Sequence, residues 1–103
     1  MAQHMALTEA TYYILLSLWT PQHGYGIMQE TAQRSGGAVH LAAGTLYGAL
    51  SSLVEKGWIE QLPEKDRKKE YRLTEAGREA LRAEHARLKQ LVEQGNAVME
   101  AEA

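Results

Sequence analysis

The sequence predicts a mainly helical α+β fold in one unit of 103 residues. Apolar residues recur at helical spacing in several separate segments. Two short runs rich in strand-forming residues flank a polar loop near residue 65. The chain is also too short for more than one ordinary domain. We therefore expect the order helix, helix, short strand, helix, hairpin, helix.

The first helix is predicted to begin after Thr8 and to end before Pro21. Thr8 is a favourable N-cap because its hydroxyl can accept a backbone N–H of the first turn. Residues 11–19, "TYYILLSLW", are apolar on nearly every face, which is typical of a helix buried all round. Since a chain of this size has only a small core, we expect a subunit contact on one side of this helix.

The second helix is predicted from Gly24 or Tyr25 to Arg34, after a turn in "TPQHGYG". Glycines in "SGG" at 35–37 suit the left-handed exit from a helix. "VHL" at 39–41 alternates apolar and polar residues and predicts a short strand. The residues expected on the inner side of the second helix are Ile27, Met28, Thr31 and Ala32.

The third helix has the clearest pattern, within "GTLYGALSSLVEKGW" at 44–58. Its predicted apolar face comprises Leu46, Leu50, Leu53 and Val54. Lys56 and Gly57 favour a helix end there. The opposite face is small and polar: Gly44, Thr45, Gly48, Ser51, Ser52 and Glu55, with Tyr47 at its edge. Glycine and serine weaken a helix, so we expect something to approach this backbone closely.

A β-hairpin is predicted from "WIEQL" at 58–62 and "EYRLT" at 70–74. Residues 65–72 hold five of the eleven Lys and Arg residues and two acids, a local charge of +3 in a chain of net charge −2. The cations therefore lie at the tip and on the returning arm of the hairpin. Such segregation indicates a negatively charged partner. The alternative is a solvated turn.

The last helix is predicted to begin near Glu75, capped by Thr74. Positions 81, 88, 91, 95 and 98 approach a heptad spacing, which predicts a partner helix. Gly95 interrupts the stripe, as a point either of close approach or of fraying. The apolar stripe comprises Ala76, Ala80, Leu81, Leu88, Leu91, Val92, Val98 and Met99.

Three helices followed by a basic hairpin predict a winged helix-turn-helix. In that arrangement the third helix enters the DNA major groove, and we expect the hairpin to reach an adjacent groove or the backbone. Residues 1–74 would then be the DNA-binding domain and residues 75–103 the dimerisation helix of one compact unit. Residues 1–6 and 100–103 are expected to be flexible.

Three segments carry a resemblance to a known family: "HGYGI", "GTLYGALSSLVEKGWIE" and "KKEYRLTEAGREAL". Over residues 7–90 the chain resembles the PadR family of transcriptional regulators, and its length is similar to that of the short subgroup. The resemblance implies a winged-helix dimer that represses transcription and releases DNA when an effector binds. The chain departs from the family at Gly48, where Pro is common, and in the wing, where Gly-Arg often precedes the basic run.

The DNA contacts are expected on the third helix and the wing. Tyr47 is the first candidate, since its phenol can donate to a phosphate while the ring packs on the domain; the alternative is a half-buried core residue. None of the small residues can make the bidentate base contacts of Arg, Asn or Gln, so phosphate contacts and DNA shape should carry much of the binding. The candidates are Tyr25, Gly44, Thr45, Tyr47, Gly48, Ser51, Ser52, Lys65, Arg67, Lys68, Lys69 and Arg72.

Helices one and four are expected to form the homodimer, because together they carry more apolar surface than the chain can bury alone. The resemblance further implies a small hydrophobic or aromatic effector near that interface, the alternative being ordinary dimer core. The expected dimer residues are Tyr12, Leu15, Leu16, Trp19, Leu81, Leu88, Leu91 and Val92, and the effector candidates are Tyr12, Tyr13, Trp19 and Met99.

Other classes of function find little support. The histidines at 4, 23, 40 and 85 are scattered, without metal-binding or catalytic spacing, so we expect no enzyme activity, metal or cofactor. No apolar run approaches the roughly 20 residues that span a bilayer. The lack of cysteine suits the cytoplasm. The competing function is a winged-helix protein-interaction module that does not bind DNA.

Overall fold

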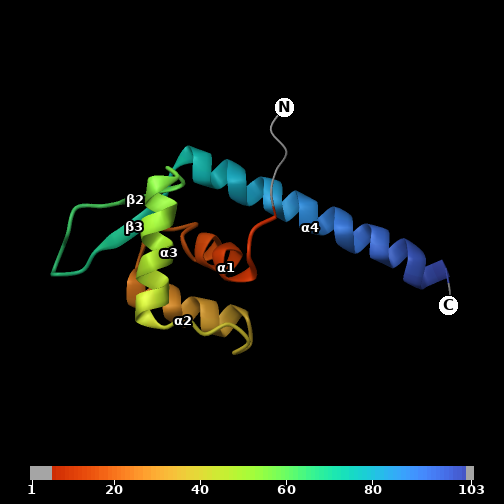
Figure 1. Cartoon of the computed structure of the whole chain (residues 1–103), viewed down its shortest axis with the longest axis horizontal. Coiled ribbons are helices and arrows are strands. Elements are labelled where there is room, and N and C mark those ends of the chain that lie inside the picture. The colour runs from red at the N-terminus through yellow and green to blue at the C-terminus, as the bar shows by residue number, and fades with distance from the viewer. Residues whose placement is uncertain (1–5, 102–103) are drawn as a thin grey trace.

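The computed structural model describes residues 6–101, which form four helices and a three-stranded sheet (Figure 1). In chain order these are α1 Glu9–Ser17, β1 Gln22–His23, α2 Gly24–Arg34, α3 Ala43–Glu55, β2 Ile59–Gln61, β3 Glu70–Leu73 and α4 Glu75–Ala101. The predicted mainly helical fold with a hairpin after the third helix is confirmed. Of the ends expected to be flexible, residues 1–5 and 102–103 lie outside the described residues, whereas Glu100 and Ala101 continue α4.

The core lies where α1, α2 and α3 meet the hairpin. Thr8 caps α1 as predicted, its hydroxyl accepting from the Thr11 N–H at 3.1 Å. On α3 the predicted face is buried except for Val54, which is 41% exposed at the edge of the core. The buried apolar residues are Ile14, Leu15, Leu18, Ile27, Leu46, Leu50, Leu53, Ile59, Tyr71, Leu73 and Leu81.

The sheet has the antiparallel strand order β1-β3-β2. Besides the two strands of the hairpin, the sheet contains β1, which pairs with β3. Gln22 lies opposite Tyr71, and His23 lies opposite Glu70. The strand predicted at 39–41 is wrong: that segment is irregular, and the Val39 N–H donates to the Ser35 hydroxyl at 2.9 Å instead of joining a ladder. Three alternating residues are too few to identify a strand, and β1 is too short to produce any pattern.

The wing is the hairpin of β2, β3 and their connecting loop, residues 59–73. Lys65 and Lys68 exchange two backbone hydrogen bonds at the tip, of 3.2 and 3.0 Å. Between them Asp66 and Arg67 have φ angles of 54° and 62°. This is the left-handed geometry of a two-residue type I′ turn, which normally selects Asn-Gly. The tip is therefore a tight turn. Its Arg67 adopts a positive φ that glycine would adopt at a lower steric cost.

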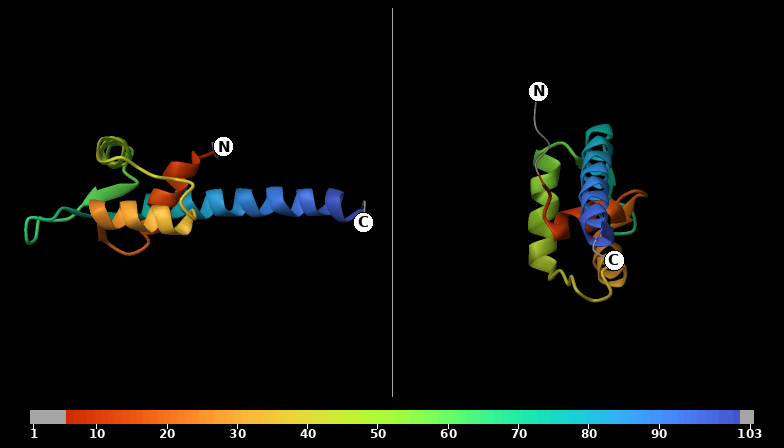
Figure 2. Two further views of the ribbon diagram at one scale, coloured as in Figure 1. Left: turned by 90° about the horizontal axis from the view of Figure 1, so that it is seen from below. Right: turned by 90° about the vertical axis from the view of Figure 1, so that its right-hand side faces the viewer.

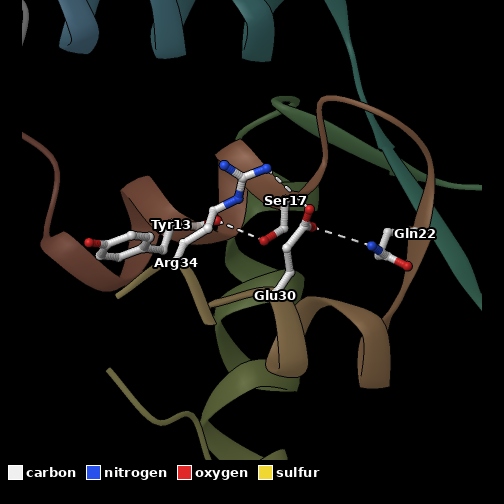
Figure 3. Close-up of polar contacts among 5 residues, drawn as sticks. All are labelled: Tyr13, Ser17, Gln22, Glu30 and Arg34. Atoms are coloured by element: carbon white, nitrogen blue, oxygen red, sulfur yellow. Dashed lines mark hydrogen bonds and ion pairs between the residues drawn. The ribbon is translucent and has the colours of Figure 1, made fainter. Parts of the chain in front are cut away.

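Polar contacts fix the turn that leads from α1 into α2 (Figure 3). The Gln22 amide donates to Glu30 at 3.4 Å, and the same carboxylate pairs with Arg34 one turn further along α2, at 3.2 Å. Near them, on α1, the Ser17 hydroxyl donates to the Tyr13 carbonyl at 3.0 Å. The Gln22–Glu30 hydrogen bond joins β1 to α2, while the other two contacts lie within α2 and within α1.

The long helix α4 leaves the rest of the molecule on the side away from the wing (Figures 1 and 2). Thr74 caps its start, accepting from the Gly77 N–H at 3.1 Å and donating to the Gly57 carbonyl at 2.6 Å. Only Gly77, Leu81 and Glu84 are buried along it. Of the two roles predicted for Gly95, fraying is wrong because the helix continues to Ala101. Nothing described lies within 4 Å of where a Cβ would stand at Gly95, so close approach by a partner helix stays a prediction.

The buried Glu84 carboxylate ties the start of the described chain to α4. It accepts from the Leu7 N–H at 3.1 Å and pairs with Arg87 at 2.7 Å. The hydrogen bond from Arg87 to Glu84 raises the pKa of the Arg87 guanidinium above its ordinary value. Among the described residues no helix is both long and apolar enough to cross a membrane.

Candidate nucleic-acid interface

An open groove of about 590 Å³ separates the wing from the first residues of α2 and from α3. Three wing cations and two tyrosines are among the residues that line it. Its lining residues are His23, Gly24, Tyr25, Tyr47, Glu64, Arg67, Lys68 and Lys69. The fold therefore brings segments that are far apart in sequence, around residues 25, 47 and 68, onto one surface. We call this surface the wing groove.

Tyr47 connects three elements at the floor of the wing groove. A Cβ built on Gly24 would lie 2.5 Å from the Tyr47 hydroxyl, so the phenol crosses directly over the start of α2. Burial raises the pKa of the Tyr71 phenol on β3, and the neighbouring Tyr47 adds to this rise. Tyr47 is nevertheless 47% exposed. It is not a core residue.

Tyr25 is the second aromatic residue of the wing groove. It was expected either to meet the DNA backbone or to be core, and its exposure of 62% excludes the core. Its hydroxyl accepts from the Gln29 amide at 3.2 Å, one turn along α2. That contact leaves the phenolic proton available for a phosphate oxygen.

The small polar face of α3 is exposed beside the wing groove. Gly44, Thr45, Gly48, Ser51 and Ser52 all lie at the surface. Nothing described lies within 4 Å of a Cβ built on either glycine, so a partner could approach this backbone closely. The N-cap residue of α3, an alanine, makes no side-chain hydrogen bond. The first-turn N–H groups are therefore not satisfied by a side-chain cap, which suits contact with phosphate.

Not every predicted cation lies in the wing groove. Arg72 donates to the Glu60 carboxylate at 2.5 Å, directly across from it on β2, and neither Arg72 nor Lys65 lines the groove. Within residues 6–101, Arg67, Lys68 and Lys69 make no ion pair, although Glu64 stands among them. The groove lining thus has three cations against one acid, and its charge is available to an external anion.

His23 was missed as a groove residue by the sequence analysis. It is the N-cap of α2, and its Nδ1 accepts from the Gly26 N–H at 3.1 Å. The signal was its position directly before a predicted helix start, but histidine is not among the usual capping residues. No group of three or more metal-ligating side chains occurs in the part of the chain that the structure describes.

A second, smaller cavity of about 210 Å³ lies between α1 and α4. The Arg78 guanidinium stacks over the Trp19 ring at 4.3 Å and donates to the Trp19 carbonyl at 3.1 Å, which joins the end of α1 to α4. The cavity is lined by Tyr12, Leu16, Trp19, Leu81, Arg82 and His85.

Some residues predicted for the dimer interface or the effector site do not lie where they were expected. Leu15 is 0% exposed in the core of its own chain, so its expected role as a dimer contact is wrong. Tyr13 stacks edge-on against Tyr12 and, like Met99 near the end of α4, does not line the small cavity. The apolar residues exposed along the outer half of α4 are Leu91, Val92, Val98 and Met99.

The comparisons with known proteins agree on one family. The sequence model of the transcriptional regulator PadR-like family matches residues 12–83. An uncharacterised 37.1 kDa protein in transposon Tn4556 of Streptomyces fradiae is 41% identical over 81 residues. That match covers 78% of this chain but only 23% of the transposon protein, so this chain spans under a quarter of that relative.

Solved structures share the fold. A PadR family transcription regulator from Clostridium difficile R20291 has a TM-score of 0.74 at 22% identity, over 87% of this chain and 97% of that one. A PadR-like transcription factor from Bacteroides fragilis has a TM-score of 0.72 at 27% identity, over 85% and 87%. Bacillus subtilis PadR in complex with operator DNA has a TM-score of 0.60 at 27% identity, over 71% of this chain and 44% of that one.

Proposed function

Because the chain belongs to the PadR-like family, whose members are transcription regulators and not enzymes, we propose that it is a homodimeric, sequence-specific DNA-binding repressor. The wing groove is the observation that supports this proposal. It places three wing cations and two exposed tyrosines beside a helix face with little side-chain bulk. A duplex is the partner that matches both features, since it offers a groove for the helix and phosphates for the cations.

In the proposed complex α3 enters the major groove and the wing follows the adjacent backbone. Arg67, Lys68 and Lys69 neutralise phosphates, while Tyr25 and Tyr47 donate hydrogen bonds to phosphate oxygens. The exposed face of α3 carries no Arg, Asn or Gln in the direct-readout role. Sequence preference would therefore come largely from DNA shape and deformability. Lys65 and Arg72 contribute to the positive field rather than to contacts.

The dimer is proposed to form through α1 and α4. Tyr12, Leu16 and Trp19 present an apolar surface next to the first turns of α4, and Leu88, Leu91 and Val92 extend it outward. Pairing of two such surfaces would cover the exposed stripe and place two DNA-binding units side by side on one duplex. Residues 1–74 then act as the DNA-binding domain and residues 75–103 as the dimerisation helix, in a protein of the cytoplasm.

The small cavity between α1 and α4 is the proposed effector site. It is lined mostly by carbon, with the faces of Tyr12 and Trp19 available to a hydrophobic or aromatic molecule. A ligand wedged there would alter how α1 meets α4 and hence the spacing of the two DNA-binding units, which would release the operator. A compound that binds should change Trp19 emission and weaken DNA binding together. A compound that changes neither is not an effector.

The test of DNA binding is a selection from a random duplex pool, followed by fluorescence-anisotropy titrations of a selected and a random duplex. We expect the affinity for both to fall about a thousandfold or more between 50 and 200 mM salt, as for a dimer with six or more phosphate contacts. The selected duplex should bind more tightly at every salt concentration. No enrichment and no salt-dependent binding would favour the alternative, a winged-helix protein-interaction module.

A further inference from the structure

We propose that His23 contacts a DNA phosphate through its Nε2–H, as a neutral donor, while its Nδ1 caps α2. The inference rests on the proposed DNA binding and extends it to a residue outside the predicted contact set. It starts from two observations on one ring. The imidazole lines the wing groove, and its Nδ1 accepts the Gly26 N–H at 3.1 Å.

The capping bond decides which nitrogen of the ring can donate. A nitrogen that accepts a hydrogen bond carries no proton, so a neutral His23 has its proton on Nε2. A doubly protonated ring could not accept from Gly26, and its charge would oppose the positive end of α2. The capped histidine is thus a hydrogen-bond donor without net charge, which distinguishes it from the other donors on the wing side of the groove.

The backbone of His23 is held from two sides. As part of β1 it pairs with Glu70 on β3, and as the N-cap it begins α2. Arg67, Lys68 and Lys69 line the same groove and would draw a phosphate toward the ring. A side chain that is already fixed in place loses little conformational entropy when it binds. A single neutral hydrogen bond from it therefore keeps most of its favourable free energy.

Two variants separate the two roles of the ring. His23→Asn keeps the cap, since the asparagine oxygen can accept the Gly26 N–H, but the side chain is too short to replace Nε2. His23→Ala loses both. Thr8→Ala is the matched control, because it removes the N-cap of α1, whose hydroxyl accepts from Thr11 at 3.1 Å, on a helix that does not line the groove.

Urea unfolding and anisotropy titrations of a random duplex and a selected duplex would be run on all four proteins. We expect His23→Asn to unfold like the wild type yet to bind both duplexes about tenfold more weakly, with an unchanged salt slope because a neutral donor releases no counterion. Thr8→Ala should lose stability and keep its affinity.

Two results would overturn the proposal. If His23→Asn binds as tightly as the wild type, the ring is only a cap. If its salt slope becomes shallower by about 0.9 per protomer, the ring binds as a cation and not as a neutral donor. A wild-type protein that binds neither duplex would instead refute the proposed function itself, and would do so before any variant is compared.

Discussion

The two ends of the molecule expose opposite kinds of surface. The wing and α3 present cations, tyrosine hydroxyls and small polar residues around the wing groove. The outer half of α4 presents Leu91, Val92, Val98 and Met99, each at least half exposed. Neither composition is what an isolated domain of this size needs for its own stability. The proposed function gives each surface a partner, DNA for one and a second copy of the chain for the other.

The comparison also explains why the net charge of −2 is a poor guide to function. The positive field is local to the wing, and the acids lie mostly on the helices. What a polyanion meets is the groove lining, with Arg67, Lys68 and Lys69 against Glu64. An acidic protein can thus present a basic face to DNA.

Introducing charge into the apolar end should have the largest effect. Leu91→Glu with Val92→Glu places two carboxylates at side chains that are 50% and 61% exposed on α4, where the dimer is proposed to form. We expect monomers in sedimentation velocity at micromolar concentration. DNA affinity should fall about a hundredfold or more, because two linked binding units become independent.

Gln90→Glu is the matched control for that variant, since it adds a carboxylate to the polar side of the same stretch of α4. It should remain dimeric and bind DNA normally. A double variant that stays dimeric, or a monomer that binds DNA as tightly as the wild type, would show that the apolar end does not pair copies of this chain.

Removing charge from the wing should have the next largest effect. Lys68→Ala with Lys69→Ala is expected to weaken binding to selected and random duplexes alike, with the slope of log K against log salt shallower by about 0.9 for each phosphate that the wing no longer neutralises. Anisotropy titrations at several salt concentrations measure both quantities. Lys89→Ala, which removes a cation on α4, should leave the slope unchanged. An unchanged slope in the wing variant would exclude the wing from the interface with DNA.

The smallest effect is expected at the tip of the wing, where a substitution should raise the stability of the protein. Arg67→Gly replaces a residue held at φ 62° by one that adopts this conformation without steric cost. Urea unfolding should show a gain of about 1 kcal/mol. DNA affinity should fall, since the variant removes a groove cation. A variant that gains stability and keeps full affinity would remove Arg67 from the interface.

The sequence predicted most of the fold because its signals there are strong and local. Leu46, Leu50 and Leu53 define α3, and Thr8 and Thr74 cap their helices as expected. The strand expected at 39–41 was wrong, and β1 was missed, because a two-residue strand depends on a partner far away in sequence. Of the two roles predicted for Gly95, fraying was wrong because one glycine costs only about 1 kcal/mol in a long helix, while close approach of a partner helix stays a prediction.

For the candidate site, the residue types and a surface shared by the third helix and the wing were predictable, whereas the groove that joins them to the start of α2 was not. Tyr25, Tyr47 and the wing cations were identified singly, but only the tertiary fold brings them to one groove. His23 was missed because its role depends on a capping bond to Gly26. Leu15 was assigned to the dimer because a helix that is apolar all round does not reveal which side faces its own core.

The most direct test of the shared DNA surface uses the absence of cysteine from the sequence. Single cysteines at Ser51→Cys on α3, Glu64→Cys in the wing groove and Ala97→Cys on α4 would be alkylated with a neutral reagent, with and without saturating duplex. We predict that DNA slows modification at positions 51 and 64 together and leaves position 97 unchanged. If bound DNA protects α3 but leaves the wing cysteine fully reactive, the two elements do not face the same duplex.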